Sequence, residues 1–292
     1  MMKPLISVEE LGQFSPIFRG KAGTRLAKFI LDIFEVTELD GYYQRTGGLY
    51  GPDATSALLA DLGTMYSVSG EENLAGLPEG PFITVSNHPI GSVDGIALID
   101  YFGHRRPDFK VMVNKFLTRV SNLSENFITV IPTGEERTGP TAESIGGVRE
   151  AMAHIRDGHP VGLFPSGAIS DYIPGRRPLV TMPDGSSYNE PRVRDREWQL
   201  PIVKFVKWAK VPVVPVRFFD GNSPFFYYLG AIHGWKVRVL RFPHEVMNKR
   251  GKTIRIGIGP IITPEQQAEC TSLEELRSLL RNSVYSQTAP SV

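Results

Sequence analysis

The sequence predicts an α/β protein with a mixed, mostly parallel central sheet flanked by helices and preceded by a helical N-terminal segment. Short apolar runs alternate with helical patterns over most of the chain, as they do in layered α/β folds. No helix is expected between the last two strands, at 236–242 and 253–257, which favours a mixed sheet over a purely parallel one. The front of the chain, to about residue 66, carries helical patterns only.

Composition excludes several classes of protein. The chain has 292 residues, of which 41% are hydrophobic and 22% are charged, so it can bury a core and is not intrinsically disordered. The net charge of +1 argues against bulk attraction to nucleic acid, and no nucleic-acid partner is expected. Cys270 is the single cysteine, which excludes an intrachain disulfide and a cysteine-cluster zinc site. The six histidines show no metal-ligand spacing, so no metal is expected.

The N-terminus and the apolar runs predict a cytoplasmic protein. No run approaches the ~18 apolar residues that suggest a membrane span, and acidic residues stand where a signal peptide would carry its apolar region. An amphipathic helix needs only one apolar face to lie on a membrane. A peripheral position on the inner face of the cell membrane therefore stays open.

Two helices are expected at the front of the chain. Apolar residues recur at helical spacing over 24–37, with charged residues between them. A second helix should follow Asp53, a suitable N-cap, with Leu58, Leu62 and Met65 on one face. We expect residues 1–66 to form a helical segment able to dock on a membrane, and residues 67–292 to form the α/β domain.

The rest of the chain alternates between strands and helices. Strands are expected at 82–86, 110–113, 127–131, 161–164 and 211–219, before the two at 236–242 and 253–257. Helices are expected at 95–102, around 145–155, at 199–210, and from a Ser272/Glu275 capping box to Tyr285. Function often lies on the loops that follow such strands.

The most informative loop follows the strand at 82–86. His88, a tight turn and Asp94 come before the next helix, and Pro89 and Gly91 favour a turn that can bring the two side chains together. A carboxylate on one imidazole nitrogen fixes the tautomer and stabilises the imidazolium formed when the other nitrogen takes a proton. The pair therefore suits a general base acting on a hydroxyl. The alternative is that Asp94 only caps the helix and His88 is a turn residue.

A second segment leaves the buried strand 161–164 through Phe164, Pro165, Ser166 and Gly167. Gly167 would let backbone amides approach a ligand closely. The alternative is an ordinary exit from a strand into a loop.

Three blocks in this order resemble those of the glycerolipid (1-acylglycerol-3-phosphate, PlsC-like) acyltransferase family. They are Asn87-His88 with Asp94, Phe164 to Gly167, and Val-Val-Pro-Val at 213–216. Five residues separate the histidine from the aspartate where the family usually has four, as in a bacterial subgroup similar to ornithine- and glycine-lipid O-acyltransferases and hemolysin-like proteins. The stretch 220–230 also resembles that subgroup, and the resemblance covers roughly residues 65–285.

The resemblance implies an enzyme that moves a fatty acyl group from acyl-CoA or acyl-carrier protein to the hydroxyl of a lyso-lipid, without a cofactor or an acyl-enzyme. His88 would be the general base, and Asp94 would orient it. The residues implied in binding the acyl donor or the oxyanion are Phe164, Pro165, Ser166 and Gly167. Those implied in binding the acceptor or a phosphate are Asn87, Ser92 and Arg137. The family also implies a tunnel for the acyl chain and a membrane surface under the front helices.

Two departures from the family pattern concern the acceptor. The family usually has Glu at the position of Ser166, where it is thought to bind glycerol phosphate, so the departure argues against a glycerol-phosphate acceptor. The family's second block carries an Arg after a strand, whereas the segment that places Arg137 after 127–131 does not align cleanly. Neither Ser92 nor Ser166 lies in Gly-x-Ser-x-Gly, which argues against a serine hydrolase.

A local basic excess lies between residues 176 and 210. It is either a solvated surface or a site for donor phosphates, an acidic carrier protein or anionic lipid headgroups. Its members are Arg176, Arg177, Arg192, Arg194, Arg196, Lys204, Lys207 and Lys210. Aromatic residues at 225–228, with Trp198 and Trp208, either pack in the core or contact an acyl chain or the membrane interface.

Two other functions stay open at this point. A lipid ester or thioester hydrolase could use the same histidine and aspartate on water, and would release free fatty acid without an acceptor. A non-catalytic lipid-binding module would bind liposomes and form no product with any donor.

Overall fold

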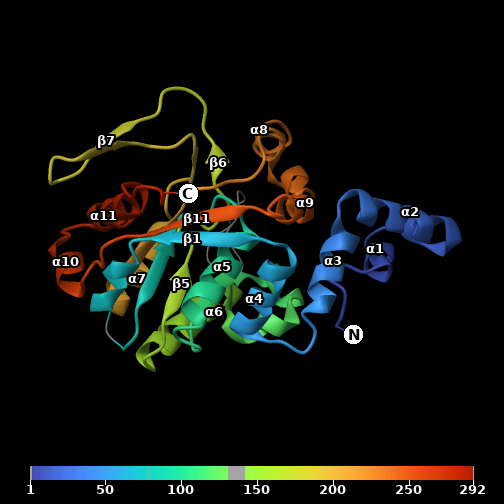
Figure 1. Ribbon diagram of the computed structural model, residues 1–292, viewed down its shortest axis with the longest axis horizontal. Coiled ribbons are helices and arrows are strands. Elements are labelled where there is room, and N and C mark those ends of the chain that lie inside the picture. The colour runs from blue at the N-terminus through green and yellow to red at the C-terminus, as the bar shows by residue number, and fades with distance from the viewer. Residues whose placement is uncertain (1, 78, 131–141, 292) are drawn as a thin grey trace.

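The computed structural model describes residues 2–77, 79–130 and 142–291. Its centre is a seven-stranded sheet in the order β1-β11-β10-β2-β5-β3-β4 (Figure 1). The strands are β1 Met65–Ser69, β2 Ile83–Ser86, β3 Lys110–Asn114, β4 Phe127–Val130, β5 Val161–Leu163, β10 Val213–Phe218 and β11 Thr253–Ile258. Parallel pairing joins β10, β2, β5, β3 and β4, whereas β11 pairs antiparallel with β10 and parallel with β1. The sheet is mixed and mostly parallel, as predicted.

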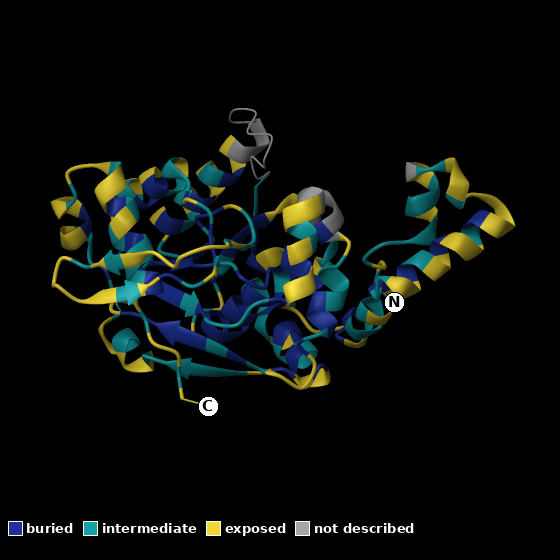
Figure 2. Cartoon of the chain, turned by 90° about the horizontal axis from the view of Figure 1, so that it is seen from above, coloured by how far each residue is buried: buried dark blue, intermediate teal, exposed yellow. Residues whose placement is uncertain are grey.

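Helices cover both faces of the sheet, and the buried residues lie between these layers (Figures 1 and 2). One apolar cluster contains residues of α4 Gly51–Asp61, α5 Ser92–Gly103 and α9 Phe242–Met247. The other contains residues of α6 Ala142–Arg156, α7 Leu200–Ala209 and α11 Leu273–Tyr285. In β10, Val213 belongs to the second cluster and Val214 to the first, because successive side chains of a strand point to opposite faces. The burial of each such valine side chain stabilises the fold by ~1.5–3 kcal/mol.

The first helices lie at one end of the molecule, beside the sheet (Figure 1). They are α1 Val8–Phe14, the 3-10 turn η1 Pro16–Phe18, α2 Gly20–Ile33 and α3 Val36–Arg45. The helix expected over 24–37 ends earlier, because Glu35 takes a left-handed conformation with φ 58° between α2 and α3. Glu35 also lies 2.8 Å from His244 Nδ1, which joins this end of the chain to α9.

Three expectations about elements were wrong. Asp53 was expected to be an N-cap, but α4 begins at Gly51 after Tyr50, and Asp53 lies in its first turn. Met65 was expected on a helix face, but α4 ends at Asp61 and Met65 begins β1, which lies at the edge of the sheet. The stretch 236–242 was expected to be a strand, but α8 Pro224–Val239 runs through most of it. A short alternation of period two cannot outweigh a helix of 16 residues that begins with proline at its first position. The sheet is mixed because β10 and β11 are antiparallel, although α8 and α9 lie between them in sequence.

A long excursion separates β5 from α7. It carries two small antiparallel pairs, β6 Asp171–Tyr172 with β9 Val193–Arg194, and β7 Leu179–Thr181 with β8 Ser187–Asn189. The remaining elements are η2 Glu71–Gly76, η3 Lys115–Arg119, η4 Ser121–Asn126 and α10 Pro264–Glu269. No described helix has both the length and the apolar character needed to span a bilayer.

Candidate active site

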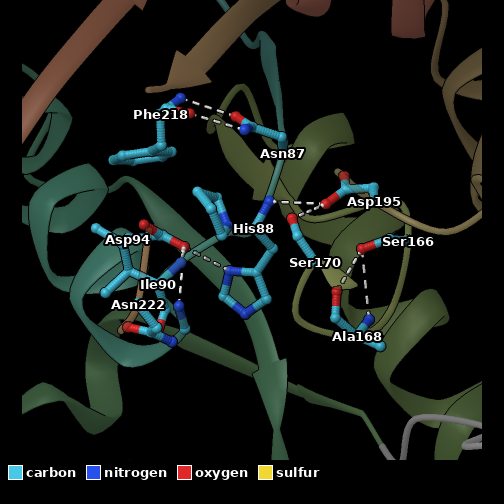
Figure 3. Close-up of polar contacts among 12 residues, drawn as sticks. Asn87, His88, Ile90, Asp94, Ser166, Ala168, Ser170, Asp195, Phe218 and Asn222 are labelled. Atoms are coloured by element: carbon cyan, nitrogen blue, oxygen red, sulfur yellow. Dashed lines mark hydrogen bonds and ion pairs between the residues drawn. The ribbon is translucent and has the colours of Figure 1, made fainter. Parts of the chain in front are cut away.

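The site lies where β2, β5 and β10 end. These strands are parallel neighbours, so their carboxyl ends meet at one edge of the sheet, where ligands of open α/β sheets bind. Asn87 follows β2 and joins it to β10. Its side-chain NH₂ donates to the Phe218 carbonyl and its oxygen accepts from the Phe218 N–H, both at 2.8 Å (Figure 3). Both polar groups of this side chain are therefore used within the fold, and its predicted contact with acceptor stays a prediction.

The next residue, His88, lies against Asp94. His88 Nδ1 and Asp94 Oδ2 are 3.1 Å apart, the Asp94 side chain is fully buried, and the His88 side chain is 19% exposed (Figure 3). Asp94 Oδ2 also accepts hydrogen bonds from the Ile90 and Gly91 N–H groups, each at 2.9 Å. Asp94 thus does both things that its position in the sequence suggested: it caps α5, and it faces the imidazole through the same oxygen. Within the described residues, neither ring nitrogen of His88 forms a hydrogen bond, and Nδ1 meets Asp94 Oδ2 at ion-pair distance only.

The turn between the two residues depends on Gly91. Its φ of +98° lies in the region that favours glycine, and a Cβ there would come within 2.6 Å of Ile169 Cδ1. The turn is therefore packed directly against the loop that follows β5, which contains Ile169. This packing brings together the two segments that sequence reasoning selected separately.

The loop after β5 is a tight turn. The Gly167 N–H donates to the Phe164 carbonyl at 2.9 Å, and the Ser166 hydroxyl donates to the Ala168 carbonyl at 2.6 Å. The Gly167 amide is thus already paired, and an oxyanion could use it only if this turn opened. Gln199 holds the loop through its own N–H to Pro165 and its side-chain NH₂ to Ser166. Ser166 is 4% exposed, so a glutamate there would bury a carboxylate within the loop.

The Phe164 ring forms one wall of the site. Its centroid lies 4.0 Å from that of the His88 imidazole, with an angle of 32° between the planes. This contact restricts the rotation of the imidazole, because the ring is held between Asp94 and an aromatic face.

Asp195 was missed in the sequence, and it contacts the His88 main chain. Its Oδ1 accepts from the His88 N–H at 3.1 Å and from the Ser170 hydroxyl at 2.6 Å (Figure 3). Its Oδ2 accepts from Trp198 Nε1 at 2.9 Å. Burial raises the pKa of this carboxyl. No sequence pattern marks it, because 107 residues separate it from His88.

The stretch 220–230 holds the other side of the turn. Asn222 donates to the Ile90 carbonyl at 3.0 Å, and the buried Tyr227 hydroxyl donates to the Pro89 carbonyl at 2.9 Å. The same hydroxyl accepts from the Asn222 N–H at 3.0 Å. These bonds explain in physical terms why a segment far from His88 in sequence belongs to the site.

A second polar cluster does not form a catalytic triad. Ser56 Oγ lies 2.9 Å from His104 Nε2 and 2.5 Å from Asp100 Oδ1. The 3.7 Å contact between His104 and Asp100 uses the same Nε2, whereas a triad needs the aspartate on the other ring nitrogen. In the part of the chain that the structure describes, no group of His, Cys, Asp and Glu could hold a metal ion.

Comparison with known proteins identifies the family of this chain. The sequence profile of the family described as "Acyltransferase" matches residues 37–289. The chain belongs to this acyltransferase family. It is 28% identical to a lyso-glycine lipid O-acyltransferase of Bacteroides thetaiotaomicron over 260 residues, covering 84% of this chain and 86% of that protein.

A protein of the same name from Phocaeicola vulgatus is 27% identical over 258 residues, with 83% of each chain covered. Among solved structures, the 1-acyl-sn-glycerophosphate acyltransferase PlsC from Thermotoga maritima matches with a TM-score of 0.45 and 15% identity. That match covers 89% of this chain and 90% of the other. The family resemblance seen in the sequence blocks is thereby confirmed.

The other predicted site residues of this acyltransferase lie in different places. Ser92 is the first residue of α5, within the turn that carries His88 and Asp94. Arg137 lies outside the described residues, so its contact with a phosphate stays a prediction. The expected acyl-chain tunnel is also still a prediction.

The basic excess of the acyltransferase is divided by the fold. Arg194 pairs with Glu190 at 2.9 Å and Arg196 with Asp171 at 2.5 Å, so both are used internally. The exposed members of the excursion are Arg176, Arg177 and Arg192. The aromatic residues divide similarly: Trp198, Phe226 and Tyr227 are buried, whereas Trp208, Phe225 and Tyr228 are exposed.

Proposed function

We propose that this acyltransferase moves a fatty acyl group from an acyl thioester to the hydroxyl of a lyso-lipid, with His88 as the general base. The observation that carries the proposal is the 3.1 Å separation of His88 Nδ1 and Asp94 Oδ2 at a solvent-accessible edge of the sheet. Both relatives are named for O-acylation of a lyso-glycine lipid, which supports a lyso-lipid acceptor of the aminolipid class.

The proposed reaction needs only an imidazole and a carboxylate. His88 Nε2 takes the proton of the acceptor hydroxyl while the oxygen attacks the thioester carbonyl carbon. Asp94 holds the tautomer with the proton on Nδ1 and offsets the positive charge that develops on the ring. The C–S bond then breaks, and the thiolate leaves and regains the proton from His88. Placing both substrates in line supplies much of the acceleration, so no acyl-enzyme is required.

The acyl donor in this proposal is acyl-CoA or acyl-carrier protein. Three exposed arginines, Arg176, Arg177 and Arg192, lie on the excursion that begins at β6. Ser170, whose N–H donates to the His88 carbonyl at 2.8 Å, immediately precedes β6. Guanidinium groups bind phosphates well, so this arrangement supports a donor that carries phosphate near the site.

We also place the protein at the inner surface of the cell membrane, through α2. Its exposed apolar residues, Leu26, Phe29 and Ile33, recur at positions that share one face of the helix, and Phe29 is 61% exposed. Basic residues of the same helix, Lys21, Arg25 and Lys28, are exposed as well. An apolar stripe beside basic residues is typical of a helix that lies on an anionic membrane.

The direct test is thiol release from acyl-CoA and from acyl-carrier protein, with and without a lyso-glycine lipid. We expect product only with acceptor, and His88→Ala should lower kcat by about 10²- to 10⁴-fold with unchanged circular dichroism. His104→Ala is the matched control, because His104 lies outside this site with a side chain 46% exposed. Fatty acid released without acceptor would indicate a hydrolase, absence of any product a lipid-binding module, and wild-type kcat in His88→Ala would exclude this base.

A further inference from the structure

His88 is held through its main chain as well as through its ring. Its N–H donates to Asp195 Oδ1 at 3.1 Å, and its carbonyl accepts from the Ser170 N–H at 2.8 Å. The Ser170 hydroxyl donates to the same Asp195 oxygen at 2.6 Å. The three residues therefore form a closed ring of hydrogen bonds that fixes the backbone of the proposed base (Figure 3).

The carboxylate in this ring is costly for the fold. Asp195 is 2% exposed, and burial raises its pKa. Its two carboxylate oxygens accept hydrogen bonds from neutral groups, which are the His88 main-chain N–H, the Ser170 hydroxyl and the Trp198 indole N–H. Hydrogen bonds of this kind compensate part of the cost of burying a charge, whereas a cation would compensate more.

The ionisable groups around Asp195 leave His88 as its natural counter-charge. Asp94 of α5 lies 3.1 Å from the imidazole Nδ1, and Tyr285 of α11 accepts the Asp195 N–H at 2.8 Å. The charged neighbours along the chain are paired elsewhere: Arg194 with Glu190, Arg196 with Asp171 and Glu197 with Arg277. Within the described residues, no lysine or arginine forms an ion pair with Asp195.

We propose that Asp195 is a positioning residue for His88, whose hydrogen bond to the His88 main chain holds the imidazole beside Asp94 and whose buried charge stabilises the protonated ring. The inference rests on the proposed function only in calling His88 the base. The positioning itself is a property of the folded chain and can be measured without any substrate.

The test compares two variants, the double variant Asp195→Asn/Trp198→Phe and the single variant Trp198→Phe. Asparagine can keep its oxygen toward the His88 N–H, but its NH₂ would then meet the Trp198 N–H, and phenylalanine removes that clash of two donors. The pair of variants therefore differs in the charge at residue 195 while sharing the same change at residue 198. Asp195→Asn alone serves as a second variant, and circular dichroism shows whether each protein is folded.

The first readout needs no substrate: it is the rate at which diethyl pyrocarbonate modifies His88, measured over a range of pH. Peptide mass mapping identifies the modified residue. This reagent acylates the unprotonated imidazole, so loss of a nearby negative charge should move the midpoint of modification to lower pH. We expect a shift of at least about half a pH unit relative to Trp198→Phe. Ser186→Ala is the control: this exposed serine between β7 and β8 donates its hydroxyl to Asp184 and has no bond to Asp195, so the His88 midpoint should stay in place.

The second readout is kcat for acyl transfer to lyso-glycine lipid. We expect kcat to fall at least about tenfold between the two variants with little change in KM, because the change affects the base and not the binding of lipid. The inference would be overturned if Asp195→Asn/Trp198→Phe is folded and its His88 is modified with the same pH midpoint as in Trp198→Phe. If the midpoint shifts but wild-type protein transfers no acyl group, the positioning stands and the proposed function fails.

Discussion

Asp94 shows how one carboxylate can serve the fold and the proposed chemistry together. Its Oδ2 accepts from two main-chain N–H groups at the start of α5 and lies 3.1 Å from His88 Nδ1. The cap explains how a fully buried carboxylate is tolerated, since two N–H donors at a helix N-terminus compensate part of its charge. It also fixes the oxygen at the position where the imidazole needs it.

Asp94→Asn separates these two roles. An asparagine oxygen can keep both capping hydrogen bonds, so thermal stability should change little, but the ring loses its negative neighbour. We expect kcat to fall by about 10²- to 10⁴-fold at neutral pH. Asp94→Ala should lose the cap as well and unfold more easily, by about 0.5–2 kcal/mol. Wild-type kcat in folded Asp94→Asn would contradict the orienting role.

The elements around His88 come from distant parts of the chain. The turn at 88–91 is packed between the loop after β5 and the stretch that begins α8. Each element contributes hydrogen bonds to main-chain groups of the turn, and buried main-chain groups must find partners. The geometry of the site therefore depends on how α8 is placed as much as on β2 itself.

Tyr227→Phe tests this dependence on α8. The change removes the hydrogen bond to the Pro89 carbonyl and leaves the Asn222 N–H without its partner. We expect the free energy of unfolding to fall by about 1–3 kcal/mol, because a buried donor is left unsatisfied. Tyr228→Phe is the matched control, since Tyr228 is 58% exposed. Equal denaturation midpoints for the two variants would show that α8 does not stabilise the turn.

At the level of the whole molecule, the sheet edge where β2, β5 and β10 end and the helices α1–α3 belong to different parts of the structure (Figure 1). The proposed substrate is a lipid, so one part would bind the membrane while the other carries the chemistry. The apolar stripe of α2 is exposed to solvent in this chain, which leaves it free to contact lipid.

Phe29→Ser/Ile33→Ser tests the membrane contact. These side chains are 61% and 58% exposed, so their loss should leave thermal stability nearly unchanged. Sedimentation with vesicles of phosphatidylglycerol and phosphatidylcholine should show at least about tenfold weaker binding. Leu179→Ser, at a residue 63% exposed on β7, is the control and should bind as wild type. Unchanged binding of the double variant would rule out α2 as the docking helix.

Local sequence signals were sufficient for most strands, for the Ser272 cap and for the His88/Asp94 pair, but not for the start of α4, where Asp53 is not the N-cap. A strand end, a turn with Pro89 and Gly91, and a carboxylate at the start of a helix lie within a few residues of one another, so their contact follows from local geometry. The blocks around these residues were also enough to indicate the acyltransferase family. The signal failed at 236–242, where a short alternation of period two overlaps the end of a helix of 16 residues.

Only the tertiary structure decided which distant residues support that pair. Asp195 and Tyr227 contact the turn although 107 and 138 positions separate them from their partners in it, and no local sequence pattern predicts these contacts. The reason is physical: a buried main-chain group requires a partner but does not specify from which segment that partner comes. The same packing decided that Trp198 is core while Trp208 is exposed, and that the Gly167 amide is already paired.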